Sequence, residues 1–499
     1  MGCFSKFFSS AILFMFLLLL LIPSSAHMLS NEQGYISAVI SNKGLDFVKN
    51  LLINKATSSI IPLEVPDIQK SLKIPLLGKV EMVLSDITIY RVDIDTSYAE
   101  TGERGFLLAV SGATANISMN WEYSYGTWLL PTISDGGTAS VLVEGVEAGF
   151  TVALKEQGGT IKLPLFDCGS HVNDISIKLD GGASWLYKAI LEAFQGKIRS
   201  AVEDAVTKKI REEITKLDIL LQSLPKQIPV NDIAAMNVTF VNSPVLSNSS
   251  VELEISGLFT GTSGTSLLNY YNEGSQSYAS CDDPTTMIRI ALHENVFISG
   301  ALVYFNANRM RWIVDNVPDK SLLNTSGWRY IVPKLYKQYP NDEMNLNMSV
   351  TSPPIIQVSE HGIDATVYLD VTINVLDSNE VVPVACISLV ISASCSPKIS
   401  ANNLVGIIRL IDFTASLKWS NIGNLNMYLV QSVMSVILKT AFLPYVNLHL
   451  RRGFPLPLPH GFTLQNAEIF CINYRLVICS DIGLDRIELS PSAANFYYN

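Results

Sequence analysis

The chain is constrained most by a plan that occurs twice along its 499 residues. In each of two long sections, an apolar helical stretch comes first, strands follow, and an amphipathic helix lies near the end. Apolar residues three or four apart indicate a helix, and alternation indicates a strand with one buried face. The repeated plan therefore predicts an α+β fold of two domains, each with helices on an antiparallel sheet.

The first section has two candidate helices on either side of its strands. The earlier helix is expected at about 37–56, and strands are expected at 79–95, 105–119 and 137–154. The later helix is expected at about 185–222, and its apolar stripe has a spacing of four. The stripes of these two helices are Leu45, Val48 and Leu52, then Leu186, Ile190, Phe194 and Ile198.

A region rich in Ser, Gly, Asn and Thr at 241–284 separates the two sections and is expected to be a linker. The second section then has candidate strands at 363–376, 384–394 and 404–419, and a late helix at about 427–442. One face of that helix carries Val430, Val433, Met434 and Ile437. The expected division is a signal peptide at 1–26, an N-terminal domain at 27–240, the linker and central region at 241–284, and a C-terminal domain at 285–499.

The apolar stripes have two interpretations. They are the core-facing sides of ordinary helices, or they line elongated pockets in which lipid tails replace core side chains. Periodicity does not separate the two, because both require a continuous apolar face.

The N-terminus predicts secretion. Lys6 precedes an apolar run that Pro23 ends, and small residues lead to an expected cleavage after Ala26. We therefore expect an extracellular, soluble glycoprotein with disulfides. Five sequons are candidate glycosylation sites: Asn116, Asn237, Asn248, Asn324 and Asn347.

Motifs of catalysis, phosphate binding or metal binding do not occur in the sequence. The adjacent Ser170 and His171, with Asp174 close by, are too near in sequence to be expected to form a triad. Six histidines show no metal-ligand spacing, and the formal net charge of −10 argues against nucleic acid as a partner. We expect a protein without cofactor or metal that is not an enzyme.

Four aromatic residues lie at the expected hairpin end between two strands, namely Trp121, Tyr123, Tyr125 and Trp128. They are either a local packed cluster or a contact with a membrane interface, where Trp and Tyr place an apolar ring and a polar tip.

Several stretches together resemble the family of bactericidal/permeability-increasing and lipopolysaccharide-binding proteins, within the wider tubular lipid-binding group. The likeness covers nearly all of the mature chain. Its matching stretches lie at 43–47, 72–79, 184–186, 420–423 and 453–459. The resemblance implies two curled antiparallel β-barrels with long helices, joined by a central sheet in a boomerang shape. Each barrel would hold a lipid between its helices and its sheet.

The resemblance also implies a function: recognition of bacterial lipopolysaccharide through lipid A at a membrane surface, in innate immune defence. Residues 105–154 contain no Lys or Arg, unlike the basic tip of the family's antibacterial members. Lipid A phosphates would then be met by Lys70, Lys73 and Lys79. The alternative is an extracellular phospholipid-transfer protein without lipopolysaccharide specificity.

The cysteines depart from the family pattern. Cys168 matches the family's N-domain disulfide region, but the following helix has no cysteine. Cys168 is therefore expected to pair elsewhere, with Cys281 as one candidate, or to remain free. Cys386 and Cys395 lie on one expected strand, too far apart to pair with each other.

Overall fold

The computed structural model describes residues 34–74, 78–127, 130–181, 187–223, 225–261, 281, 286–378, 380–451, 453–456, 458 and 461–484. It contains two compact units. Unit 1 includes residues 40–224 and 242–253, and unit 2 includes residues 225–241 and 254–499 with the segment 21–39. The predicted signal peptide lies outside the described residues.

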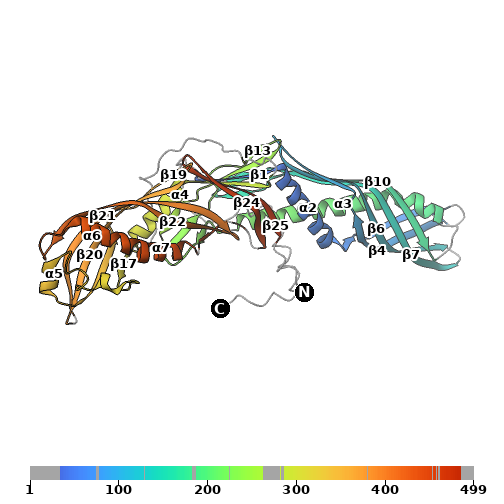
Figure 1. Ribbon diagram of the computed structural model, residues 1–499. Helices are drawn as coiled ribbons and strands as arrows, with labels where there is room; N and C mark the ends of the chain where they lie inside the picture. The colour runs from blue at the N-terminus through green and yellow to red at the C-terminus, as the bar shows by residue number, and fades with distance from the viewer. Residues whose placement is uncertain are drawn as a thin grey trace. The chain divides into compact units, whose positions relative to one another are not determined.

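Unit 1 is built on a seven-stranded antiparallel sheet. Its central path runs β10-β7-β6-β4-β2, with β3 paired to β4 and β5 paired to β6. Figure 1 shows the long strands of this sheet in blue and cyan. The strands are β2 (Leu63–Val65), β3 (Ile68–Ile74), β4 (Gly78–Asp93), β5 (Thr96–Gly102), β6 (Gly105–Thr127), β7 (Leu130–Val152) and β10 (Leu165–Asp180), beside a small pair of β8 (Lys155–Gln157) and β9 (Thr160–Lys162).

Two helices pack against unit 1's sheet. The first, α2 (Asn42–Ile60), begins at an N-cap where the Ser41 hydroxyl accepts a hydrogen bond from the Gly44 amide. The second, α3 (Tyr187–Gln222), has 36 residues. Both sequence-based helices are confirmed, except that residues 36–41 form strand β1 (Ile36–Ser41) before α2 begins.

Unit 2 repeats this arrangement with a second seven-stranded sheet. Its path runs β17-β18-β20-β21-β22-β23, with β19 paired to β20. The strands are β17 (Arg311–Val314), β18 (Glu343–Val350), β19 (Ile355–Ser359), β20 (Gly362–Asp377), β21 (Glu380–Ser400), β22 (Asn403–Ser420) and β23 (Phe454–Pro455). Its helices are α4 (Glu294–Asn306), α5 (Pro333–Gln338), α6 (Met427–Ile437) and α7 (Leu443–Leu450), with a 3-10 turn at Lys320–Leu323 and a π turn at Leu438–Phe442.

Two further sheets complete the architecture. A six-stranded sheet has the order β13-β14-β1-β16-β25-β24, and the division between the units falls within β1 and β14. A three-stranded sheet has the order β11-β12-β15. Their remaining strands are β11 (Gln227–Pro229), β12 (Ala234–Asn237), β13 (Val245–Ser247), β14 (Ser250–Ile255), β15 (Phe259–Gly261), β16 (Ile288–His293), β24 (Phe462–Ile472) and β25 (Arg475–Leu484). The expected linker therefore contains strands, because β13, β14 and β15 lie within 241–284.

The predicted mixed fold of helices on antiparallel sheets is confirmed. The expected curled antiparallel sheets are confirmed, and among the described residues they do not close into barrels, since β10 and β2 are the two ends of unit 1's sheet path. Long strands twist strongly, and an open twisted sheet curls around a helix without closing on itself.

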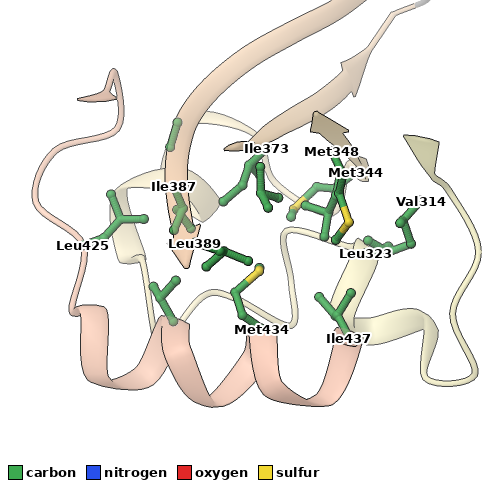
Figure 2. Close-up of a cluster of buried hydrophobic side chains, with 14 of the residues drawn as sticks. Val314, Leu323, Met344, Met348, Ile373, Ile387, Leu389, Leu425, Met434 and Ile437 are labelled. Atoms are coloured by element: carbon green, nitrogen blue, oxygen red, sulfur yellow. The ribbon is translucent and has the colours of Figure 1, made fainter. Parts of the chain in front are cut away.

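One helical stretch of the described residues, Met427–Leu450, is long and apolar enough to cross a membrane by length and composition. Core helices of soluble proteins can have the same composition. Here Val430, Met434 and Ile437 of α6 are buried in unit 2's core. Figure 2 shows Met434 and Ile437 pointing from the helix toward Ile387, Leu389 and Met344.

Candidate functional site

Unit 1 contains an apolar cavity of about 230 Å³ between its two helices and its sheet. A cavity needs only about 10–15 Å³ to hold one water, and an apolar lining gives water few hydrogen-bond partners. The lining from α2 and the segment after it is Leu52, Ile53, Ala56, Thr57, Ile61 and Leu63; from the sheet it is Ile89, Val92, Ile94, Leu108–Val110, Ala113–Ala115, Val146 and Ala148–Phe150; and from α3 it is Val202, Val206, Ile210, Glu213, Ile214 and Leu217.

Small residues on the sheet account for this space. The lining stretch of β6 contains Ala109, Ala113 and Ala115, and the facing stretch of β7 contains Ala148 and Gly149. Side chains of this size do not fill the space between the helices and the sheet. A lipid tail can occupy such space, because it is the physical equivalent of missing core side chains.

The helix α3 changes role along its length. Phe194 and Ile198 are buried in the main core of unit 1, against residues such as Val141 and Ile117. Val202 belongs both to this core and to the cavity lining, and after it Val206, Ile210 and Ile214 line the cavity. The first part of α3 therefore attaches the helix to the sheet, and the second part forms one wall of the cavity.

The sequence-predicted pocket residues divide accordingly. Leu52 lines the cavity. Leu45 and Val48 are buried but are not part of the lining, and Phe194 and Ile198 belong to the core of unit 1. Leu186 lies outside the described residues, and the side chain of Ile190 is not described. In unit 2, Val430, Met434 and Ile437 are fully buried in the core, and Val433 is half-buried against the same core. Figure 2 shows Met434 and Ile437 within this core.

Sequence reasoning missed most of the α3 wall and the whole sheet wall. The α3 wall continues the apolar stripe in steps of four, from Val202 through Val206 and Ile210 to Ile214. The sheet side of the cavity could have been found from the many Ala and Gly residues in β6 and β7. Where small residues cluster, the side chains do not fill the core completely.

Glu213 is the acidic residue in this apolar lining. Its Oε1 lies 2.8 Å from the Lys216 Nζ and 3.2 Å from the Lys209 Nζ, both on α3. Its Oε2 is buried and has no hydrogen-bond partner. The two ammonium groups balance the carboxylate charge, but both contact the same oxygen.

Three lysines lie at or near the β3–β4 hairpin of unit 1. Lys73 and Lys79 are exposed and are direct partners in the strand register, and they border a surface hollow with Ile74 and Gly78. The Lys79 Nζ contacts the Glu81 Oε1 at 2.6 Å, and this ion pair lowers the pKa of Glu81. The Lys70 Nζ donates to the Ala193 carbonyl at 2.8 Å, so Lys70 helps to fasten α3.

Two of the four aromatic residues expected at the hairpin end, Trp121 and Tyr123, are buried in unit 1. Trp121 and Tyr123 are only 2% and 4% exposed, and the Trp121 Nε1 donates to the Thr138 carbonyl. Their rings stack with that of Tyr125 in a packed series. Burial raises the pKa of Tyr123. Trp121 and Tyr123 therefore pack locally and are not available to a membrane surface, while Tyr125 is half-buried and Trp128 lies outside the described residues.

The five sequons have different environments. Asn248 and Asn347 are exposed, whereas Asn116 and Asn237 are half-buried within β6 and β12. Asn324 is half-buried, and its Nδ2 donates to the Asn341 carbonyl at 3.1 Å.

A disulfide joins Cys281 to Cys479 in unit 2. The suggested pairing of Cys168 with Cys281 is therefore wrong. Cys168 is a free thiol whose Sγ lies 3.6 Å from the Thr207 carbonyl of α3, and burial raises its pKa. Cys386 and Cys395 are both free, and they do not pair with each other, as expected from their separation along one strand.

Ser170 and His171 serve to attach β10 to α3. The Ser170 hydroxyl donates to the Glu203 carbonyl at 2.8 Å, and the His171 Nδ1 lies 3.2 Å from the Glu203 Oε1. The Asp174 carboxylate accepts from the Ile175 amide next to it.

Two family models match the chain along nearly all of its described length. The N-terminal domain of the LBP / BPI / CETP family matches residues 44–224, and the C-terminal domain matches residues 229–484. Helices on curled antiparallel sheets, with an apolar cavity between them, define the class of tubular lipid-binding folds. The chain belongs to the LBP / BPI / CETP family.

Individual relatives agree with this assignment. A BPI/LBP family protein of Arabidopsis thaliana is 50% identical over 470 residues, covering 93% of this chain and 96% of that protein. Human lipopolysaccharide-binding protein is 23% identical over 450 residues, covering 89% of this chain and 92% of that protein. The crystal structure of a lipopolysaccharide-binding protein superposes with a TM-score of 0.63 at 19% identity, covering 91% of this chain and 100% of that one. Family membership supports lipid binding as the coarse function.

Proposed function

We propose that this is a secreted protein that holds the acyl chains of amphipathic lipids in the cavity of unit 1 and recognises bacterial lipopolysaccharide in defence. The observation that carries the proposal is the apolar cavity itself. Burial of apolar surface stabilises the complex by roughly 25 cal/mol per Å², so a chain that fills the cavity binds without polar contacts.

The lysines of the β3–β4 hairpin support lipopolysaccharide as the amphiphile. Lys73 and Lys79 are paired directly across the two strands, and like charges opposite each other destabilise a sheet. An anionic group placed between them would reduce that repulsion, in competition with the Glu81 carboxylate that already pairs with Lys79. Lipid A phosphates have the required charge, and ammonium groups are common phosphate ligands.

Phospholipid transfer without lipopolysaccharide specificity is the second candidate. The chain's net charge of −10 and the absence of Lys and Arg from residues 105–154 favour it. Insertion of exposed aromatic side chains into a membrane would also favour this candidate, but Trp121 and Tyr123 are buried. Contact with a membrane surface through the basic hairpin is therefore the better-supported mode.

Secretion is supported by two features of the chain. The Cys281–Cys479 disulfide fits an oxidising compartment. Exposed sequons at Asn248 and Asn347 fit passage through a glycosylating pathway.

Co-sedimentation with liposomes across a salt series tests the choice between the two candidates. Lipopolysaccharide-containing and zwitterionic liposomes are compared, using the wild-type chain and the Lys73→Ala/Lys79→Ala variant. We expect wild-type binding to lipopolysaccharide liposomes to fall steeply with salt, because exposed charges are screened within about 3 Å at 1 M. We expect the variant to bind them weakly at every salt concentration.

The matched control is Lys155→Ala/Lys208→Ala, which removes the same charge from two other exposed lysines of unit 1. Equal loss of binding in the control and the hairpin variant would contradict a specific phosphate site. Equal, salt-insensitive binding to both liposome types would favour the phospholipid-transfer candidate instead.

A further inference from the structure

The helical stretch Met427–Leu450 of unit 2 is apolar on its outer side as well as on the side that faces the core. It consists of α6, the π turn and α7, which follow one another along the unit (Figure 1). Its inner side packs into the core through Val430, Met434 and Ile437. Of its most apolar 18 residues, however, only 22% are buried. A helix that is hydrophobic all round is normally covered on every side, by a large core or by a membrane. The outer side therefore calls for an apolar partner.

The outer side presents large side chains in one continuous line. Exposed residues recur in steps of four along α6 and reach α7 after a step of five, from Thr440 to Tyr445. The π turn at Leu438–Phe442 accounts for the longer step, because its hydrogen bonds span five residues instead of four. At 1.5 Å per residue, the line is about 30 Å long. The exposed fractions along it are 80% for Tyr428, 43% for Val436, 50% for Tyr445 and 58% for Leu448.

Two hydroxyl groups on this outer side are bonded to the helix itself. The Ser432 hydroxyl donates to the Tyr428 carbonyl at 3.1 Å, and the Thr440 hydroxyl donates to the Val436 carbonyl at 2.8 Å. A hydroxyl bonded to the carbonyl four residues earlier does not depend on water for a partner. Both groups can therefore enter an apolar environment without leaving a donor unsatisfied.

The charges around this helix have one sign. Residues 413–467 contain no Asp or Glu, in a chain whose formal net charge is −10. Lys439 and Arg451 are exposed, and long basic side chains can reach from an apolar surface to anionic headgroups. A second copy of this chain fits poorly, because a two-fold contact through this side would bring its basic residues together with no carboxylate of the helix between them. An anionic lipid surface supplies the opposite charge, and its acyl region covers apolar side chains.

We propose that the outer side of Met427–Leu450 lies in the interfacial region of an anionic bilayer and gives unit 2 a membrane contact of its own. Tyr428 and Tyr445 suit this region, because a tyrosine places an apolar ring and a polar hydroxyl at the level of the headgroups. The inner side stays in the core, so the helix lies along the membrane and does not cross it. This contact goes beyond the proposed function, which places headgroup binding at Lys73 and Lys79 of unit 1.

Vesicle co-sedimentation tests the inference in the Lys73→Ala/Lys79→Ala background, which removes the contribution of the hairpin. The full-length secreted chain is mixed with vesicles of dioleoylphosphatidylcholine, alone or with added dioleoylphosphatidylglycerol. The test variant carries Tyr428→Ser, Tyr445→Ser and Leu448→Ser in addition. We expect it to bind the mixed vesicles about 10–100-fold more weakly than the background chain, because three apolar side chains no longer enter the interface.

The matched control carries Tyr330→Ser, Tyr474→Ser and Ile355→Ser in the same background. It removes the same kinds of side chain from exposed positions of unit 2 outside the helix, and we expect it to bind as the background chain does. Lys439→Glu should weaken binding to the mixed vesicles by about fivefold or more, since each basic residue near an anionic surface contributes that much, and should change binding to phosphatidylcholine vesicles little. Circular dichroism and urea unfolding check that every chain is folded.

Each contrary outcome identifies what is wrong. Equal binding by the test variant and the matched control would overturn the inference. Failure of the background chain to bind the mixed vesicles would also overturn it, and would leave the cavity and the hairpin site of unit 1 untouched. Light scattering without lipid tests the competing occupant: a dimer that the three substitutions of the test variant dissociate would show that a second copy of the chain covers this side instead.

Discussion

At the residue scale, the protonation of His293 links the stability of the fold to pH. It is 2% exposed, caps α4 by accepting from the Asn295 amide through Nδ1, and leaves its Nε2 buried without a partner. Burial, and then the charge of Arg475, lowers its pKa from 6.5 to about 4. The folded state therefore holds a neutral imidazole that the unfolded state protonates.

The sign of the pH dependence follows from this depressed pKa. Above about pH 6.5 neither state binds the proton, and His293 has no effect on the free energy of unfolding. As the pH falls from about 6.5 to about 4, only the unfolded state is protonated, so stability decreases, by as much as about 3 kcal/mol. Urea unfolding between pH 7 and pH 4.5 measures this loss.

The variant His293→Asn isolates the effect of His293. Asparagine also caps helices, so α4 keeps an acceptor at its start, but asparagine does not titrate. We expect His293→Asn to lose clearly less stability than the wild type over the same pH range. The same pH slope in both chains would show that other groups cause the acid sensitivity.

A neighbouring residue provides a test of hydrogen bonding. Glu294 is 2% exposed, and its Oε2 accepts from the Val358 amide of β19 at 3.0 Å. Glu294→Ala should lower the free energy of unfolding by about 1–3 kcal/mol, because the buried amide loses its partner. Hydrogen exchange at Val358 should accelerate in the variant. Unchanged exchange there would contradict the assigned bond.

At the scale of elements, α3 should respond differently to the same change in its two parts. Phe194 is fully buried in the core, so Phe194→Ala should cost about 3–5 kcal/mol. Ile210 lines the cavity, so no side chains pack against it on that side. Ile210→Ala should therefore lower the free energy of unfolding by much less than Phe194→Ala. Urea unfolding compares the two variants. Equal costs would mean that the cavity wall is packed as tightly as the core.

The elements also show where sequence reasoning succeeds. The sequence predicts both long helices and the strands now seen as β6 and β7, because their periodicity is strong. Strand alternation puts Ile117, Met119, Trp121 and Tyr123 on one face of β6, and all four are buried, which favours the packed cluster over a membrane contact for Trp121 and Tyr123. The cavity could not be located from helical stripes alone, because its volume depends on which small residues face α3 across the sheet. Which small residues lie side by side on the sheet depends on strand pairing between residues far apart in the chain. Ala109 and Gly149, which are paired in the β6–β7 register, are one example.

At the scale of the whole molecule, the covalent modifications are predicted to be few. We expect glycans at Asn248 and Asn347, which are exposed, and none at Asn324, whose Nδ2 is already bonded. Peptide mapping before and after enzymatic removal of glycans identifies the sites. The same maps, made without reduction, should contain a Cys281–Cys479 linked peptide and a labelled Cys168. A glycan at Asn324 or a linked Cys168 would contradict these environments.

The central claim is that the space between α2, α3 and the sheet of unit 1 holds lipid. Native mass spectrometry of the secreted chain, compared with Val206→Trp, tests it most directly. Val206 lines the cavity, and a tryptophan there fills part of its about 230 Å³. We predict co-purifying lipid on the wild-type chain and much less on the variant, with both folded. Equal lipid on both chains, or none on the wild type even after incubation with lipid, would contradict the claim.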